Sequence, residues 1–216
     1  MISQAQFPTQ GLYAITPENI LRDENSLEKI EAVILGGAKV IQLRLKDQDQ
    51  TQQSMEKIIQ IRKICEKFSV AFIINDDVNL AFKIEADGVH LGQHDISYRA
   101  ARRILGNDKI IGISCYNNLE RAVNAAEKGA TYIALGSFYN SLTKKRALRC
   151  GIDILQQTSK KIKIPIVAIG GITPKNGRIL VENGANFLAC VDALFKDDNG
   201  FDSARELNLL FEWVTK

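Results

Sequence analysis

The sequence predicts a single (β/α)8 barrel of parallel strands, and three observations support this α/β fold. Short β-branched runs alternate with amphipathic, helix-period stretches along the whole chain. Eight such runs begin about 25 residues apart, which is the spacing of βαβ units in a parallel sheet. Many of them are apolar at consecutive positions, as expected for strands that are covered on both faces. An open, doubly wound sheet is the alternative fold.

The elements can be assigned in chain order. Strands are expected over Leu12–Thr16, Val40–Leu45, Ala71–Asn75, Gly88–Leu91, Ile110–Ser114, Tyr132–Gly136, Ile164–Gly170 and Phe187–Val191. Helices are expected over Leu27–Leu35, Gln52–Phe68, Leu119–Lys128, Ile152–Lys161 and Lys175–Asn183. Ser26 is expected to cap the first of these helices, and Gly129 and Gly184 stand where helices should end.

Length and composition indicate one domain spanning residues 1–216. The chain is 45% hydrophobic and 25% charged, and no linker or low-complexity tract divides it. Its 28 Lys and Arg residues against 25 Asp and Glu give a net charge of only +3, which argues against a nucleic-acid partner. Small-molecule substrates are expected instead, and homo-oligomer formation is left open.

The chain is expected to be cytoplasmic, with no contact to membranes. Its longest apolar stretch, Ile164–Ile172, has nine residues and cannot span a bilayer. The first basic residue is Arg22, so no charged leader is predicted. Four widely spaced cysteines (Cys65, Cys115, Cys150 and Cys190) show no zinc-ligand spacing and are typical of small core residues in a reducing compartment.

Polar residues gather at the predicted carboxyl ends of the strands, where a parallel barrel builds its active site. Gln42, Arg44 and Lys46 alternate with leucines, so they share one face of a strand. Facing the barrel mouth, these three side chains could hold an anion, with Arg44 binding it in bidentate fashion. A strand end exposed to solvent is the alternative.

Two aspartates are candidate ligands for Mg²⁺. Asp76 follows the third strand and Asp95 follows the fourth, so both are expected at the same end of the barrel. Asp77 is expected instead to cap the next helix or to lie in its first turn. His90, within a strand, is given a core or hydrogen-bonding role rather than a metal role.

Two loops are further candidates. Residues 138–146 form a polar segment that ends in three cations, which is typical either of a substrate-covering loop or of a solvated one. Gly170 and Gly171 end the most apolar strand, where missing side chains let backbone N–H groups approach a phosphate.

Taken together, these residues resemble thiamine-phosphate synthase, also called thiamine-phosphate pyrophosphorylase. The similarity spans about residues 11–195 and rests on LYAITP, VIQLRLK, FIINDDVNLA, ADGVHLGQHD, IGISCYN, GSFYNSLTK and AIGGI. The resemblance implies a (β/α)8 barrel. It also implies a Mg²⁺-dependent transferase that condenses 4-amino-2-methyl-5-(diphosphooxymethyl)pyrimidine with a thiazole phosphate, giving thiamine phosphate and pyrophosphate.

The resemblance also implies roles for individual residues. Pyrimidine-diphosphate binding falls on Gln42, Leu43, Arg44, Leu45, Lys46, Asn75, Ser114 and Lys144. Arg44, Lys46 and Lys144 are the expected catalytic cations, and Asp76 and Asp95 the Mg²⁺ ligands. Thiazole-phosphate binding falls on Ser141, Leu142, Thr143, Gly171, Val191 and Asp192. Ser141 and Asp192 depart from the family's usual threonine and serine, and a carboxylate beside a phosphate is unfavourable unless it turns away.

The chemistry expected of these residues is stabilisation of a departing polyanion. An aminopyrimidine can itself stabilise the cation left behind, so no protein nucleophile is needed. Ser114 shows no histidine base in the sequence pattern, which argues against covalent serine catalysis. The alternatives are a related thiazole tautomerase, another phosphate-handling barrel and a non-catalytic pyrimidine or thiazole phosphate binder. The tautomerase uses a histidine shortly after the strand-five serine, where this chain has Cys115-Tyr116-Asn117.

Overall fold

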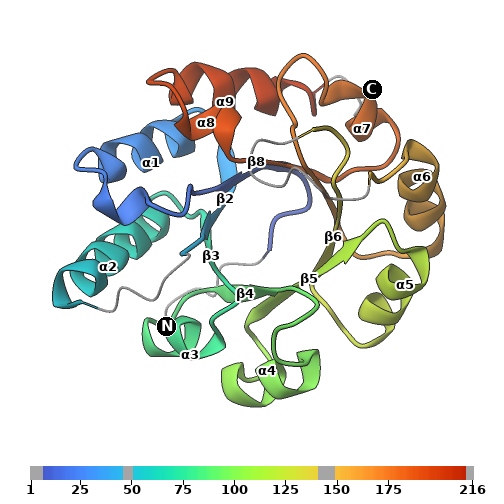
Figure 1. The fold of residues 1–216 in the computed structure, drawn as a ribbon, viewed down its shortest axis with the longest axis horizontal. Coiled ribbons are helices and arrows are strands. Elements are labelled where there is room, and N and C mark those ends of the chain that lie inside the picture. Colours follow the sequence, from blue (N-terminus) through green and yellow to red (C-terminus); the bar gives the residue numbers. More distant parts are fainter. Residues whose placement is uncertain (1–6, 46–50, 141–148, 213–216) are drawn as a thin grey trace.

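Eight parallel strands form a closed barrel in chain order in the computed structural model, which describes residues 7–45, 51–140 and 149–212. The helices surround the strands as an outer ring (Figure 1). The strands are β1 (Gly11–Ile15), β2 (Ala38–Leu43), β3 (Ala71–Asn75), β4 (Gly88–Leu91), β5 (Ile110–Tyr116), β6 (Tyr132–Gly136), β7 (Ile166–Ile169) and β8 (Phe187–Cys190). The predicted barrel is confirmed, and the open sheet is excluded because β8 pairs with β1.

Helices follow the strands around the barrel. They are α1 (Ser26–Leu35), α2 (Gln52–Lys67), α3 (Val78–Lys83), α4 (Tyr98–Leu105), α5 (Leu119–Glu127), α6 (Ile152–Lys161), α7 (Arg178–Glu182), α8 (Asp192–Phe195) and α9 (Gly200–Leu209), with a 3-10 turn at Ile20–Arg22. No helix among the described residues is both long and apolar enough to cross a membrane.

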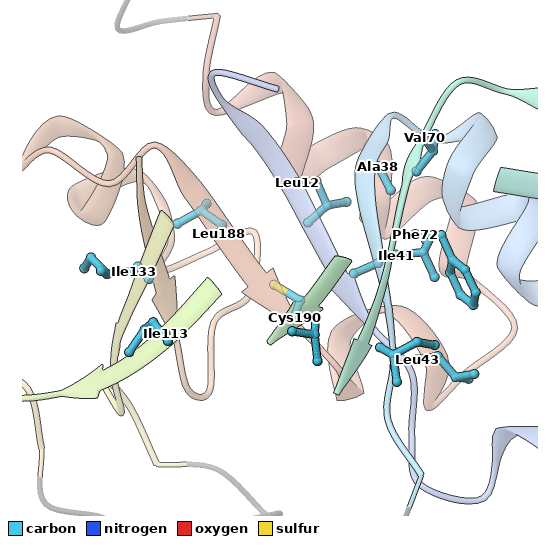
Figure 2. Packing of buried hydrophobic residues seen from close by; sticks show 14 of the residues in the cluster. Leu12, Ala38, Ile41, Leu43, Val70, Phe72, Ile113, Ile133, Leu188 and Cys190 are labelled. Carbon is cyan, nitrogen blue, oxygen red and sulfur yellow. The ribbon is translucent and has the colours of Figure 1, made fainter. Parts of the chain in front are cut away.

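Strand residues alternate between two separate hydrophobic clusters, as the pleat requires. Leu12, Ile41 and Phe72 belong to the outer cluster between the strands and the helices, and Figure 2 shows Ile41 beside Phe72 on neighbouring strands β2 and β3. Tyr13 and Tyr132 belong to a smaller cluster inside the barrel. The strands are therefore buried on both faces, as their consecutive apolar residues predict.

Several aromatic rings pack against one another in the inner cluster. Phe7 stacks on Tyr132 with ring centroids 4.6 Å apart and lies 5.1 Å from the Phe187 ring. Tyr13 and Tyr132 are in turn tilted together at 5.8 Å. Aromatic pairs at these separations are favourable beyond the area that they bury. These rings fill the barrel interior beneath the polar residues of the site.

Several predicted boundaries are wrong by one to three residues, among them those of β2, which spans Ala38–Leu43 rather than Val40–Leu45. Asn25, not Ser26, is the N-cap of α1, and the Ser26 hydroxyl is buried without a hydrogen-bond partner. Strand β7 begins at Ile166 rather than Ile164, because Pro165 has no N–H to donate to the sheet. Its carbonyl still accepts a hydrogen bond from the Ile133 N–H at 3.1 Å.

Candidate active site

A cavity of about 370 Å³ opens within the barrel, and inward-facing strand residues and the loops that follow strands β7 and β8 line it. That volume suits a small organic ligand. Seven of the residues to which the resemblance assigns binding roles line this cavity, together with Gly170: Gln42, Arg44, Asn75, Ser114, Gly171, Val191 and Asp192. Strands far apart in the sequence thus bring five of the predicted polar residues to one place.

Strand β2 places its polar residues as the alternation predicts. Gln42 and Arg44 line the cavity. Leu43 is fully buried in the outer cluster, and Leu45 packs against the same cluster. The two leucine side chains therefore face the helix layer, and neither residue lines the cavity. Lys46 lies outside the described residues.

Two neighbours that the sequence analysis did not select hold Arg44 in position. Its guanidinium forms a 2.7 Å ion pair with Glu18, and both side chains are about a quarter exposed. Its backbone N–H donates to the buried hydroxyl of Thr16 at 3.0 Å. Because the guanidinium has five donors, pairing with one carboxylate leaves others for an anionic ligand.

Asp76 and Asp95 come together at the ends of β3 and β4. Their carboxyl groups are hydrogen-bonded, and burial followed by this contact raises the pKa of Asp76 to about 6. Asn75 and the charge of Arg44 act in the opposite direction. Two ionised carboxylates this close would repel each other, and a divalent cation between them would remove that repulsion, so the pair suits a metal ion.

The backbone around this pair is held in place. Asp76 adopts the left-handed conformation (φ 64°), and its N–H donates to the His90 carbonyl at 2.9 Å. Asp95 accepts a hydrogen bond from the Gly92 N–H at 2.6 Å. Asp77 caps α3 by accepting from the Leu80 N–H at 2.9 Å, so its assignment as a capping residue is confirmed.

The donors present fit Mg²⁺ rather than a softer metal. Among the described residues, no three His, Cys, Asp or Glu side chains gather into a cluster. Asp76 and Asp95 instead supply two carboxylates beside the Asn75 amide. Magnesium commonly takes one or two carboxylates and completes its octahedron with water and substrate phosphates.

Ser114 is hydrogen-bonded to a histidine, so the expectation that no histidine accompanies it is wrong. His90 Nε2 lies 2.9 Å from Ser114 Oγ, and His90 Nδ1 lies 3.0 Å from the Tyr132 hydroxyl. The hydrogen-bonding role expected for His90 is confirmed. The contact between His90 and Ser114 could not be read from the sequence pattern, because His90, Ser114 and Tyr132 lie on three different strands, β4, β5 and β6. The register reveals it, because His90 aligns with Gly112, two residues before Ser114.

The loop after β7 packs closely on the segment that follows β6. A Cβ on Gly171 would lie 2.3 Å from the Asn140 carbonyl oxygen, and Gly171 has φ 62°. Asn176 holds this loop by donating to the Gly171 carbonyl at 3.0 Å and accepting from the Thr173 N–H at 2.8 Å. The glycine pair therefore permits both a turn and a close backbone approach.

The remaining predicted residues lie around this loop. Val191 is the N-cap of α8, and Asp192, its first residue, is exposed at the cavity edge. Ser141, Leu142, Thr143 and Lys144 lie outside the described residues.

The cysteines are structural. All four are free and buried. Burial raises the pKa of Cys115 and of Cys150 to about 12, so neither thiol ionises near neutral pH.

Comparison with known proteins agrees with this geometry. The family model described as thiamine monophosphate synthase matches residues 12–194. The chain belongs to this family. It is 42% identical over 205 residues to the thiamine-phosphate synthase of Methylococcus capsulatus, covering 95% of this chain and 91% of the relative. It is 43% identical over 187 residues to that of Nitrosococcus oceani, covering 87% and 86%.

Solved structures extend the comparison to the fold. A thiamine phosphate pyrophosphorylase from Pyrococcus furiosus superposes with a TM-score of 0.84 at 32% identity, covering 96% of this chain and 98% of that one. A geranylgeranylglyceryl phosphate synthase from Thermoplasma acidophilum matches with a TM-score of 0.68 at 16% identity and shares the fold alone. The barrel architecture is thus common to several activities, and the thiamine-phosphate synthase relatives reported above stand out by sequence identity.

Proposed function

We propose that this enzyme condenses 4-amino-2-methyl-5-(diphosphooxymethyl)pyrimidine with a thiazole phosphate to give thiamine phosphate and pyrophosphate. Membership of the family supports the overall reaction. The structural observation that carries the proposal is that Arg44 lines the cavity while its positive charge acts on Asp76, which is hydrogen-bonded to Asp95. A cation beside a divalent-metal site is the arrangement that a diphosphate leaving group requires.

The proposed mechanism gives the protein three tasks. Arg44, Lys46 and Lys144 meet negative charge on the leaving diphosphate, and Glu18 keeps the Arg44 guanidinium in place. Asp76 and Asp95 would hold Mg²⁺, which when bound neutralises diphosphate oxygens. Asn75 lies beside them as a further polar contact.

The pyrimidine itself can carry the positive charge left by diphosphate departure, so the chain supplies no nucleophile. Gln42 and Ser114 would orient the ring within the cavity. Gly171, Val191 and Asp192 line its other side, where they and residues 141–143 would receive the thiazole phosphate. The barrel then brings the thiazole nitrogen to the cationic carbon and excludes water, which is catalysis by positioning.

An omission experiment separates this function from its rivals. The full chain is incubated with Mg²⁺ and with each substrate alone, then with both, and products are separated by chromatography. We expect thiamine phosphate only with both substrates and Mg²⁺. Isomerisation of a thiazole phosphate without the pyrimidine would indicate the tautomerase. Thermal stabilisation by the pyrimidine diphosphate without any product would indicate a binder, and either result would overturn the proposal.

A further inference from the structure

A continuous chain of hydrogen bonds crosses the barrel interior. The Gln42 side-chain nitrogen donates to the Tyr13 hydroxyl at 2.9 Å, and the Tyr13 and Tyr132 hydroxyls lie 2.7 Å apart. The Tyr132 hydroxyl lies 3.0 Å from His90 Nδ1, and His90 Nε2 lies 2.9 Å from Ser114 Oγ. These five residues come from five different strands, and all five, including Gln42 and Ser114 at the two ends of the network, line the cavity.

Burial makes the order of protons along this chain well defined. Tyr13 and Tyr132 are 1% and 0% exposed, Gln42 3% and His90 8%. Burial raises the pKa of both phenols, so each keeps its single hydrogen at any physiological pH. A buried hydroxyl hydrogen without an acceptor is costly, so each hydrogen is expected to point to the next oxygen or nitrogen.

The direction follows from counting hydrogens. The Gln42 nitrogen can only donate, so Tyr13 accepts from it and passes its own hydrogen to Tyr132. If Tyr13 accepted hydrogen bonds from both Gln42 and Tyr132, its own hydroxyl hydrogen would have no acceptor within this hydrogen-bond network. Tyr132 in turn donates to His90 Nδ1, which leaves a neutral imidazole with its proton on Nε2. His90 then donates to Ser114 Oγ.

We propose that Tyr13, Tyr132 and His90 are positioning residues that hold Ser114 as a hydrogen-bond donor to the substrate. The Ser114 hydroxyl, already an acceptor from His90, has its hydrogen left for the cavity. Gln42, already a donor through nitrogen, has its carbonyl oxygen left as an acceptor. This inference rests on the proposed function, because an aminopyrimidine carries both an amino donor and ring-nitrogen acceptors.

The opposite proton order would have a different chemical consequence. If the Gln42 oxygen faced Tyr13, every hydrogen bond would reverse and Ser114 would donate to His90 Nε2. That is the arrangement of an activated serine nucleophile. The direction of the hydrogen bonds therefore decides between two roles for Ser114: orienting the substrate ring, or attacking the substrate as a nucleophile.

Nitrogen-15 spectroscopy of the histidine side chains tests the proton order directly. The chain has two histidines, and His94 is exposed, so a His94→Gln variant leaves His90 as the single signal. In the substrate-free protein at neutral pH we expect the neutral tautomer with the proton on Nε2. A proton on Nδ1, or an imidazolium, would overturn the inference. This measurement does not depend on the reaction, so its result stands even if no thiamine phosphate is formed.

Tyr132→Phe supplies the kinetic test. The variant keeps a ring to stack on Phe7 and removes only the hydroxyl that donates to His90. Its matched control is Tyr98→Phe, which removes a hydroxyl bonded to the Gly129 carbonyl at 2.9 Å in a residue that does not line the cavity. We expect Tyr132→Phe to raise KM for the pyrimidine diphosphate about tenfold and leave KM for the thiazole phosphate unchanged. Tyr98→Phe should change neither.

A conservative replacement of His90 separates positioning from packing. His90→Gln retains a side-chain N–H that can donate to Ser114, whereas His90→Phe keeps the ring volume without a donor. We expect His90→Gln to recover most of the pyrimidine KM that His90→Phe loses. Equal kinetics in the two His90 variants would mean that the hydrogen-bond network has only a structural role. The same conclusion would follow if Tyr132→Phe lowered thermal stability but left the His90 tautomer and the KM unchanged.

Discussion

Replacing Gly171 by alanine should damage the active site beyond its cost to stability. A Cβ at this position lies 2.3 Å from the Asn140 carbonyl oxygen and 2.9 Å from the Tyr139 Cβ. Ordinary contact requires the Asn140 backbone to move by roughly 1 Å. Asn140 lines the cavity, immediately before the residues proposed to receive the thiazole phosphate. The shift therefore reaches the site.

The magnitude follows from two separate costs. A left-handed backbone costs an alanine about 1–2 kcal/mol relative to glycine, and overpacking costs about 1–3 kcal/mol. Together these predict a loss of about 2–5 kcal/mol in the free energy of unfolding. A displacement of about 1 Å at a site that acts by positioning can lower kcat/KM by about 100-fold.

Gly106 provides the matched control. It also has a positive φ, 81°, at the end of α4, but a Cβ there would meet nothing within 4 Å. Gly106→Ala should cost about 1–3 kcal/mol of stability through strain alone and leave kcat/KM unchanged. Both variants are measured by urea unfolding and by steady-state kinetics with varied thiazole phosphate. If Gly171→Ala retained kcat/KM within about threefold, or if both variants lost activity equally, the positional argument would be refuted.

Three further predictions concern the metal, the loop cation and a thiol. The pKa of Asp76 is raised to about 6, so below that pH Mg²⁺ must displace a proton in order to bind. The thermal stabilisation that Mg²⁺ gives should therefore be full above about pH 6 and should shrink as the pH falls through that value. Asp76→Asn and Asp95→Asn should each abolish that stabilisation and most activity while the barrel stays folded. Lys144→Ala should lower kcat by roughly 30- to 1000-fold, corresponding to about 2–4 kcal/mol, whereas Lys145→Ala should have a small, salt-sensitive effect. Cys115→Ser should keep near wild-type turnover, because burial keeps the thiol protonated.

Each of these has an outcome that contradicts it. Mg²⁺ stabilisation that is independent of pH between 5 and 8, or that survives in both aspartate variants, would place the metal elsewhere. Equal, salt-sensitive losses in the two lysine variants would indicate diffuse steering by a charged loop. Loss of turnover in a folded Cys115→Ser enzyme would give that thiol a chemical role.

The repeated features of the sequence predicted most of the fold. A closed barrel follows from regular strand spacing, and two-faced burial follows from consecutive apolar residues such as Leu12 and Tyr13, which enter the outer and inner clusters. The ends of the elements were predicted less well. The N-cap of α1, for example, is Asn25 rather than Ser26. Such choices depend on packing around one turn, which periodicity does not encode.

Site residues were predictable where a strand end fixes them. Gln42 and Arg44 share a face through the two-residue period, and Asp76 and Asp95 meet because neighbouring parallel strands end at the same edge. Contacts between strands far apart in the sequence were not predictable. The Tyr13 and Tyr132 hydroxyls are 119 residues apart in the chain and 2.7 Å apart in space, and only the register of a closed barrel brings them together.

The central claim is that this chain joins the two substrates and releases pyrophosphate. The most direct test mixes the pyrimidine diphosphate, the thiazole phosphate, Mg²⁺ and the enzyme, and quantifies thiamine phosphate and pyrophosphate in the same samples over time. The account predicts equal amounts of both products at every time point, with formation lost in Arg44→Ala. Pyrophosphate formed without thiamine phosphate would indicate hydrolysis of the diphosphate, and the absence of both products would contradict the assigned activity.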